Sequence, residues 1–250
     1  MILPLVHSAW NTSIYYPLYN SLIWLIDVLP GHSVGVAIII LTLLVKLVIY
    51  PLTAKSIKSQ RAMKELEPEL KKIREKYSDN KQKQAEQTMA LYKERGVTPF
   101  SGCLPMLIQI PIIIGLYFVF FRGIKEIDAS ILYSFVQVPL SLDMHFLAFD
   151  LAGKSIVLAL LAGITQYFQT SISLGKTVPQ KASSTTDKPS FQEDFARSMQ
   201  IQMRYVLPIM VGFIAFTTSA AVALYWVTSN IVSIGQEFLV KRNTKKVETE

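Results

Sequence analysis

The chain has 250 residues, of which 51% are hydrophobic, and carries a formal net charge of +7 at pH 7. Its apolar runs are long enough to cross a bilayer as helices, which excludes a soluble globular protein and predicts a polytopic membrane protein. The basic residues fall between these runs, where cytoplasmic loops are typically basic, so membrane topology explains the charge and DNA is not an expected partner. The single cysteine excludes an internal disulfide framework.

Residues 1–33 contain no lysine or arginine and are rich in aromatic and apolar side chains. Asn20 and Asp27 interrupt the apolar run and Pro17 divides it, which favours an external amphipathic segment lying at the membrane interface. A first true membrane span is the alternative. The first ten residues lack the basic start and the long apolar core of a secretory signal, so we expect them to remain in the mature protein.

The first predicted transmembrane helix covers residues 34–52, VGVAIIILTLLVKLVIYPL. These nineteen residues, at 1.5 Å each, give about 28 Å, close to the thickness of the hydrocarbon core. The one charge in this run, Lys46, costs on the order of 2.5–3.5 kcal/mol at the centre of a bilayer. The side chain therefore either snorkels to the interface or faces a wet cavity, and the length of the run leaves both open.

Residues 53–101 hold twelve lysines and arginines against seven acidic residues, so this segment is predicted to be cytoplasmic. Apolar residues recur at helical spacings on both sides of the turn sequence at 78–80, which predicts a helical hairpin. Pro68 suits the first turn of a helix better than its interior, so we expect a break near Glu67. Charge on the outer faces indicates either plain solvation or the docking of a partner.

The second and third transmembrane helices are predicted at residues 102–122 and 154–174, with an external loop at 123–153 between them. The second helix contains Pro105 and Pro111. Because prolines leave backbone carbonyls without their helical donor, this helix should bend and pack against neighbours or water.

The last apolar run follows a polar cytoplasmic loop at 175–203 and is too long for one comfortable crossing. Two helices at 204–217 and 219–239, joined by a turn at 217–219, are the better interpretation, and a basic cytoplasmic tail follows at 240–250. The predicted fold class is all-α: a polytopic membrane protein with five transmembrane helices and a cytoplasmic helical hairpin, its N-terminus outside and its C-terminus in the cytoplasm.

The sequence contains motifs that resemble catalytic or ligand-binding sites, but their surroundings do not fit those functions. AFDLAGKS at 148–155 fits a relaxed phosphate-loop pattern, but its Lys154 opens a predicted membrane helix instead of following a strand, so we expect no nucleotide binding. The three histidines lack metal-ligand spacing, and no serine or cysteine has a recognisable partner. We therefore expect no metal, no cofactor and no enzymatic activity.

Lys46 remains the chemical oddity within the apolar runs. No aspartate or glutamate lies in the central part of any predicted span. A lysine that faces the bundle interior would then meet neutral side chains and water, which suits a hydrated cavity. The candidate neutral partners are Thr42, Gln109, Gln166, Gln169 and Asn230.

Three passages resemble the YidC group of bacterial membrane protein insertases, and the similarity extends over the chain from about Tyr16 onward. They are IIILTLLVKLVIYPLT at 38–53, MALYKERGVTPFSGCLPMLIQIPI at 89–112 and LYWVTSNIVSIGQ at 224–236. Several motifs in one order argue against chance similarity. The large external domain of many members is absent, so the chain is similar to the short form of the family.

The resemblance implies roles for individual residues. The family carries an arginine in a water-filled groove that opens to the cytoplasm and to lipid, and Lys46 occupies its place. The family's groove threonine matches Thr42. Further matches are the paired prolines, Pro105 and Pro111, and the aromatic pair of the last span, Tyr225 and Trp226. Lysine keeps the charge but lacks the planar fork of donors that binds a carboxylate, so only a point charge carries over.

The function implied by the resemblance is that of a membrane protein insertase and chaperone in the bacterial cytoplasmic membrane. The implied substrate groove comprises Lys46, Thr42, Gln109, Gln166, Tyr225, Trp226 and Asn230. The implied partners are nascent membrane proteins and the lipid bilayer, with the ribosome and the Sec translocon as further candidates. Two rival interpretations are a secondary transporter with a buried cationic site and a structural scaffold in which Lys46 snorkels.

Overall fold

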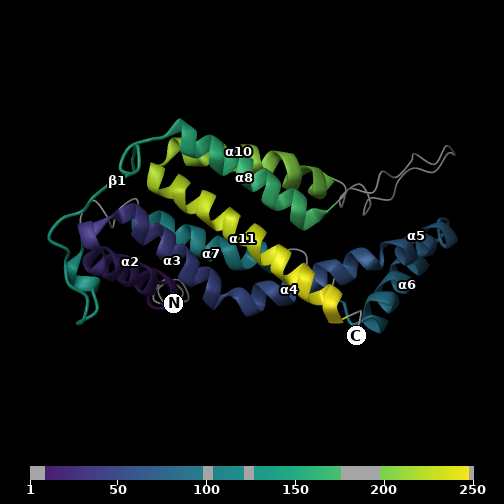
Figure 1. Cartoon of the computed structure of the whole chain (residues 1–250). Helices are drawn as coiled ribbons and strands as arrows, with labels where there is room; N and C mark the ends of the chain where they lie inside the picture. Colours follow the sequence, from purple (N-terminus) through teal and green to yellow (C-terminus); the bar gives the residue numbers. More distant parts are fainter. Residues whose placement is uncertain (1–8, 98–103, 121–126, 176–197, 248–250) are drawn as a thin grey trace, which may run out of the picture. The chain divides into compact units, whose positions relative to one another are not determined.

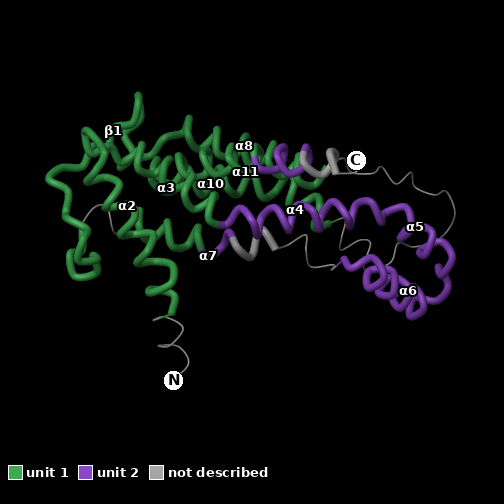
Figure 2. The backbone as a smooth tube through the Cα atoms, turned by 60° about the horizontal axis from the view of Figure 1, so that its bottom comes forward, with its two compact units in different colours: residues 1–48, 112–235 green, residues 49–111, 236–250 purple. Residues whose placement is uncertain are grey.

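The structure, a computed structural model, describes residues 9–97, 104–120, 127–175 and 198–247. The chain divides into two compact units, which Figure 2 shows in different colours. Unit 1 comprises Met1–Val48 and Ile112–Gly235, and unit 2 comprises Ile49–Pro111 and Gln236–Glu250. The described residues are mainly helical, and the strands among them are two residues long, so the predicted all-α class is confirmed.

The apolar helices of unit 1 share one hydrophobic core. The helical elements that lie wholly in this unit are η1 (Asn11–Tyr15), α2 (Tyr16–Val28), η2 (Pro30–His32), α3 (Val34–Val48), η5 (Ala129–Ile131), α8 (Ile156–Leu174), η6 (Gln202–Val206) and α10 (Leu207–Thr217) (Figure 1). Two further helices, α7 (Leu104–Phe118) and α11 (Ala220–Val247), belong to unit 1 over part of their length.

The helix α3 is the apolar run that contains Lys46, and it ends where a proline intervenes. Pro51 stands in the first turn of α4 (Tyr50–Glu65), where a missing N–H is tolerated. Because Pro51 cannot donate to the carbonyl of Leu47, the hydrogen-bond ladder of α3 cannot continue through it. The two helices are therefore separated at Ile49.

The helix α2 is held by the segment at residues 127–153. The carboxamide of Asn20 donates to the Ile131 carbonyl at 3.0 Å and accepts from the Tyr133 N–H at 2.6 Å. The hydroxyl of Tyr19, which is fully buried, accepts from the Asp128 N–H at 3.0 Å. Asn20 interrupts the apolar pattern of α2, and its carboxamide is the hydrogen-bond partner of two backbone groups in this segment.

A small β-hairpin at residues 145–150 packs on the start of α3. Its strands are β1 (His145–Phe146) and β2 (Phe149–Asp150), which pair antiparallel. A Cβ added at Gly35 would lie 2.4 Å from the ring of Phe146, so no larger residue fits at position 35 without movement. The Val34 N–H donates to the Asp143 carbonyl at 3.0 Å, which aligns the segment with the first turn of α3.

The helices α8 and α10 approach closely at two glycines. A Cβ at Gly163 would lie 3.2 Å from the Pro208 carbonyl oxygen, and a Cβ at Gly212 would lie 3.5 Å from the Ala159 carbonyl oxygen. Small residues at a helix crossing allow backbones to pack together where lipid removes the hydrophobic driving force. A Cβ at Gly163 would crowd the Pro208 carbonyl, whereas a Cβ at Gly212 would make an ordinary van der Waals contact, so this crossing depends mainly on Gly163.

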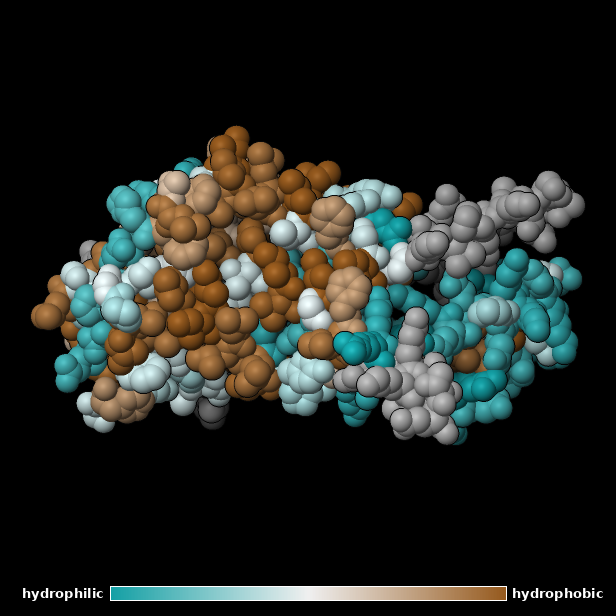
Figure 3. Space-filling model, in the orientation of Figure 1, coloured by the Kyte–Doolittle hydropathy of each residue, from teal (hydrophilic) through white to brown (hydrophobic). Residues whose placement is uncertain are grey.

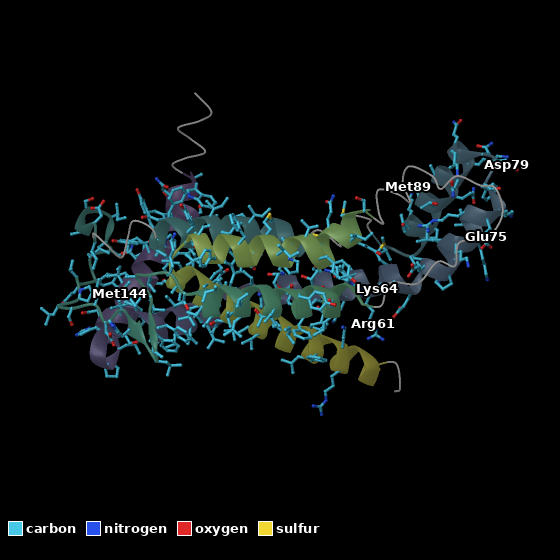
Figure 4. All side chains as sticks on the ribbon, turned by 90° about the horizontal axis from the view of Figure 1, so that it is seen from above. Arg61, Lys64, Glu75, Asp79, Met89 and Met144 are labelled. Atoms are coloured by element: carbon cyan, nitrogen blue, oxygen red, sulfur yellow. The ribbon has the colours of Figure 1, made fainter. Side chains whose placement is uncertain are left out.

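Unit 2 contains the predicted helical hairpin, with α5 (Glu67–Lys76) and α6 (Lys81–Glu94) as its arms. Its small apolar core consists of Leu66, Leu70, Leu91 and Val97. The side chain of Asn80 accepts from the Lys83 N–H at 3.0 Å and caps α6. Figure 4 shows Asp79 at the tip of the hairpin, next to this cap.

Two described helices are long and apolar enough to cross a membrane, Ile156–Leu174 and Ser198–Thr217. The pair α3 and α4 gives a third candidate if the two helices form one broken span. Figure 3 shows hydrophobic residues over much of the visible face of unit 1 and hydrophilic residues over the hairpin of unit 2. These observations support a membrane protein, and the count of five spans stays a prediction.

Candidate functional site

Lys46 lies near the end of α3 and is 7% exposed. Its Nζ donates a hydrogen bond to the hydroxyl of Ser233, on α11, at 2.9 Å. Among the described residues of unit 1, no other charged side chain is buried. A buried charge is costly unless its environment solvates it, and a serine hydroxyl supplies a dipole and no opposite charge. The environment of this lysine is therefore the chemically distinctive part of unit 1.

Thr42 lies one helical turn before Lys46 on the same face of α3. It is 2% exposed, and its hydroxyl donates to the Ile38 carbonyl at 2.7 Å. This bond satisfies the hydroxyl hydrogen within the helix and leaves oxygen lone pairs as acceptors. The inner face of α3 thus presents a hydroxyl oxygen and an ammonium group one turn apart.

Gln166 and Thr170 form a second buried polar group, on α8. The Gln166 Nε2 donates to the Thr170 hydroxyl at 3.0 Å and to the Gln169 Oε1 at 3.1 Å. These residues are three and four positions apart, so one helix face carries all three. Their hydrogen bonds to each other lower the cost of placing amides and a hydroxyl inside an apolar unit.

The helix α11 connects these two polar groups. Its buried Asn230 donates from Nδ2 to the Thr165 hydroxyl at 3.1 Å and to the Ala162 carbonyl at 3.4 Å, both on α8. Ser233, three residues later, accepts from Lys46 on α3. Through these hydrogen bonds α11 contacts α8 at Asn230 and α3 at Ser233.

Tyr225 and Trp226 lie on α11 and are buried in the apolar core of unit 1, as part of its main hydrophobic cluster. Gln109 and Pro111 belong to the part of α7 that clusters with unit 2. Pro111 stands inside α7 and removes one helical donor. Pro105 is the second residue of α7, and its side chain lies outside the described part of the chain.

The sequence interpretation did not single out Ser233, Thr165 or Thr170. A signal was present, because Ser233 lies three residues after Asn230 and Thr170 lies four after Gln166, spacings that place each pair on one helix face. Serine and threonine are common in membrane helices, however, and which one meets the lysine depends on the tertiary packing. The described residues contain no cluster of side chains able to hold a metal ion.

Apolar helices with polar side chains and a buried lysine turned inward define an integral membrane protein with a partly polar interior. Residues 24–247 match the family described as 60Kd inner membrane protein. The chain belongs to this family, and the resemblance to the YidC group is confirmed by relatives that carry that name.

The chain is similar to Membrane protein insertase YidC of Oceanobacillus iheyensis, at 35% identity over 96% of this chain and 87% of the relative. Similarity to Membrane protein insertase YidC of Clostridium tetani reaches 39% identity over 87% of this chain and 86% of the relative. Membrane protein insertase MisCA of Bacillus subtilis is 32% identical over 93% of this chain and 79% of its own length. Each of these comparisons covers at least 87% of this chain and at least 79% of the relative.

Proposed function

We propose that the chain is a membrane protein insertase and chaperone of the bacterial cytoplasmic membrane. It lowers the cost of moving polar substrate tails across the bilayer through a hydrated, positively charged groove that opens to the cytoplasm. The observation that carries this proposal is Lys46, a buried cation in an apolar unit, whose Nζ donates to the Ser233 hydroxyl at 2.9 Å. The names of the relatives support the same activity.

The energetic argument concerns the substrate's polar end. Each unsatisfied polar group costs several kcal/mol in hydrocarbon, and a charged group costs more. A groove with water, the Thr42 oxygen and the Lys46 ammonium solvates that tail partway and attracts negative charge. The substrate's own apolar segment supplies the driving force when it reaches lipid. No nucleotide is needed.

The proposed groove takes its polar lining from three helices of unit 1. Thr42 and Lys46 come from α3, Gln166 comes from α8 and Asn230 comes from α11. The hydrogen bonds from Lys46 to Ser233 and from Asn230 to Thr165 support this assignment, because they connect α11 with both other helices. Tyr225 and Trp226, which lie on α11 within unit 1, are proposed to line the same path.

The proposed topology has five spans, an interfacial segment at residues 1–33, an outside N-terminus and a cytoplasmic C-terminus. Single cysteines at Ser130, Ser183 and Thr249 in a Cys103→Ser background should react with an impermeant thiol reagent from outside only at Ser130. Labelling of Thr249→Cys from outside would overturn the arrangement of the last two spans.

The helical hairpin of unit 2 is the proposed cytoplasmic receiver of the nascent chain, with the ribosome as a candidate partner and the Sec translocon as another. Its exposed surface is charged, and its helices carry one large exposed apolar side chain, Met89, which is 58% exposed. Charge suits a ribosome surface, and a flexible thioether suits varied apolar segments. Deletion of 67–94 should lower ribosome binding more than it lowers insertion of a substrate added after translation.

The test of the function is reconstitution of the purified chain in pure lipid vesicles with a short single-span substrate that carries an acidic tail. Insertion should exceed that of protein-free vesicles, should fall in Lys46→Ala and should persist in Lys154→Ala, which removes an exposed lysine. Insertion no better than in protein-free vesicles would refute the proposal. A small-solute flux coupled to Lys46 would instead favour the transporter.

Hydration of the groove has its own test. In the Cys103→Ser background, a cysteine in place of Lys46 should react with a water-soluble thiol reagent in intact membranes. A cysteine in place of Leu41, which is 3% exposed in the apolar core, should stay inert, and one in place of Lys55 should react. Inertness at position 46 together with reaction at position 55 would leave only the structural interpretation.

A further inference from the structure

Unit 1 has an apolar groove of about 650 Å³ between α8 and α10. Its walls include Leu160, Ile164 and Tyr167 from α8 and Ile209, Phe213 and Phe216 from α10. The groove exists because Gly163 and Gly212 bring the two backbones together at its floor while larger side chains diverge on either side. From Ile156 to Tyr167 it follows α8 for about 16 Å at 1.5 Å per residue.

Two tyrosines line one end of this groove, and a basic residue that is not part of the lining lies at the same end of the two helices. Tyr167 and Tyr205 line it there, with their ring centroids 6.1 Å apart. Arg204 precedes Tyr205, and its guanidinium donates to the carbonyl of Gly175, the residue that caps the C-terminal end of α8. An arginine therefore lies at the same end of the same two helices as the tyrosine pair. The rest of the lining is almost wholly apolar.

We propose that this groove binds one anionic phospholipid, with an acyl chain along α8 and α10 and the phosphate near Arg204. A phospholipid has the same division into a long apolar chain and an anionic end. A helix 10 Å wide and 16 Å long would occupy roughly 1,200 Å³, about twice the volume of the groove, so a transmembrane segment cannot lie within it. Basic sites between membrane helices are known to hold lipid phosphates.

The charge decides between lipid classes, whereas the groove decides whether any lipid is retained. A zwitterionic lipid offers the same chains but no net charge, so the preference for the anionic lipid should depend on Arg204. One basic residue near a membrane surface corresponds to about a fivefold gain in affinity. Under the proposed topology Arg204 faces the cytoplasmic leaflet, but lipid binding itself does not depend on that orientation.

The test is native mass spectrometry of the purified full chain in detergent, titrated with phosphatidylglycerol or phosphatidylcholine of identical chains. The unaltered chain should bind phosphatidylglycerol about fivefold more tightly. Arg204→Gln should bring the ratio close to one, while Lys154→Gln, which removes the basic residue near the opposite end of α8, should leave it unchanged. Equal affinities in the unaltered chain would overturn the proposal, as would loss of the preference in Lys154→Gln.

A second pair of variants tests the groove. Leu160→Trp fills it and should weaken both lipids at least about fivefold, whereas Leu161→Trp adds the same side chain at a neighbouring position outside the lining and should weaken neither. Circular dichroism shows whether each variant keeps its helices. If Arg204→Gln fails to fold, the comparison of Leu160→Trp with Leu161→Trp still tests whether the groove binds lipid. Displacement of the lipid by glycerol 3-phosphate would show a free phosphate site instead, and a dimer that excludes lipid would show a protein interface.

Discussion

The two units place their polar and apolar residues in opposite ways. In unit 1, the inner faces of α3, α8 and α11 carry Lys46, Gln166 and Asn230, while large apolar side chains such as Ile209 stay exposed. In the hairpin of unit 2, leucines and a valine are buried and the charged residues lie outside. In both units the side chains that suit the surroundings least are buried. Polar side chains are buried in unit 1 because it faces lipid, and apolar side chains are buried in the hairpin because it faces water.

The forces that hold the two units differ accordingly. Lipid gives helices no hydrophobic reason to associate, so unit 1 depends on close packing at Gly163 and Gly212 and on hydrogen bonds such as that of Asn230. Water does give such a reason, and the hairpin depends on a few buried side chains. A substitution that removes a contact in one unit should therefore change the stability of that unit alone.

The largest expected effect is in the hairpin core. Leu70→Ala should destabilise the hairpin by about 2–5 kcal/mol, because it removes a buried side chain from a core with few others. Hydrogen exchange of the full chain should show lost protection of amides in α5 and α6, with amides of α8 unchanged. Met89→Ala, at an exposed position of the same hairpin, should change stability by less than about 0.5 kcal/mol. Loss of protection in α8 would show that the units are not independent.

Two breaks between helices follow from local chemistry and could be predicted. Pro68 indicates the break near Glu67 and polar residues indicate the turn at 217–219, and helices end at Glu65 and Thr217. The excess of basic residues in 53–101 likewise follows from composition. Such features depend on neighbours in the sequence, so one chain read alone contains the information. The end of α3 at Val48 was not predicted, because the apolar run at 34–52 was interpreted as one helix although it contains Pro51.

Contacts between distant segments could not be predicted in the same way. The sequence indicates that Lys46 and Asn230 are polar positions in apolar runs, but not that Ser233 accepts from Lys46 or that Thr165 accepts from Asn230. The two-residue strands after Asp143 were also missed, because strands this short leave no periodicity. Tertiary packing decides each of these contacts.

The second prediction changes the sign of the interior charge in unit 1. An acidic substrate group 4 Å from Lys46 gains about 4 kcal/mol at an effective dielectric near 20 and about 1 kcal/mol in bulk-like water, and a wet groove lies nearer the lower value. Lys46→Arg should retain insertion, Lys46→Ala should impair it and Lys46→Glu should be worst, since repulsion adds to the loss. Matched acidic-tail and neutral-tail substrates provide the measurement. Equal losses of insertion for both substrates would show that Lys46 maintains the hydration or shape of the groove and does not attract the substrate's charge.

The third prediction concerns packing without charge. Gly35→Ala places a Cβ 2.4 Å from Phe146 and should destabilise unit 1 by about 1–3 kcal/mol, measured as a lower unfolding temperature in detergent. Phe146→Gly removes the atoms in the way, so the cost of Gly35→Ala should be much smaller in that background. Gly235→Ala is the control, because no atom lies within 4 Å of the added Cβ and alanine favours a helix. An equal cost of Gly35→Ala in both backgrounds would contradict the overlap with Phe146.

The smallest expected effect is an exposed ion pair in unit 2. Arg95 Nη2 lies 2.8 Å from Glu69 Oε1 and connects the residue after α6 with the start of α5. Because both side chains are about half exposed, water screens the attraction, and Arg95→Ala should cost only about 0.2–1 kcal/mol by hydrogen exchange of the hairpin. The loss should shrink at 1 M salt, where the screening length falls to about 3 Å. The charge-swapped double variant Glu69→Arg with Arg95→Glu should restore most of the lost stability. As a control, Lys71→Ala removes a 3.8 Å pair with Glu75 inside one helix and should cost no more stability than Arg95→Ala. A salt-independent loss would mean that the stem of Arg95, and not its charge, stabilises the hairpin.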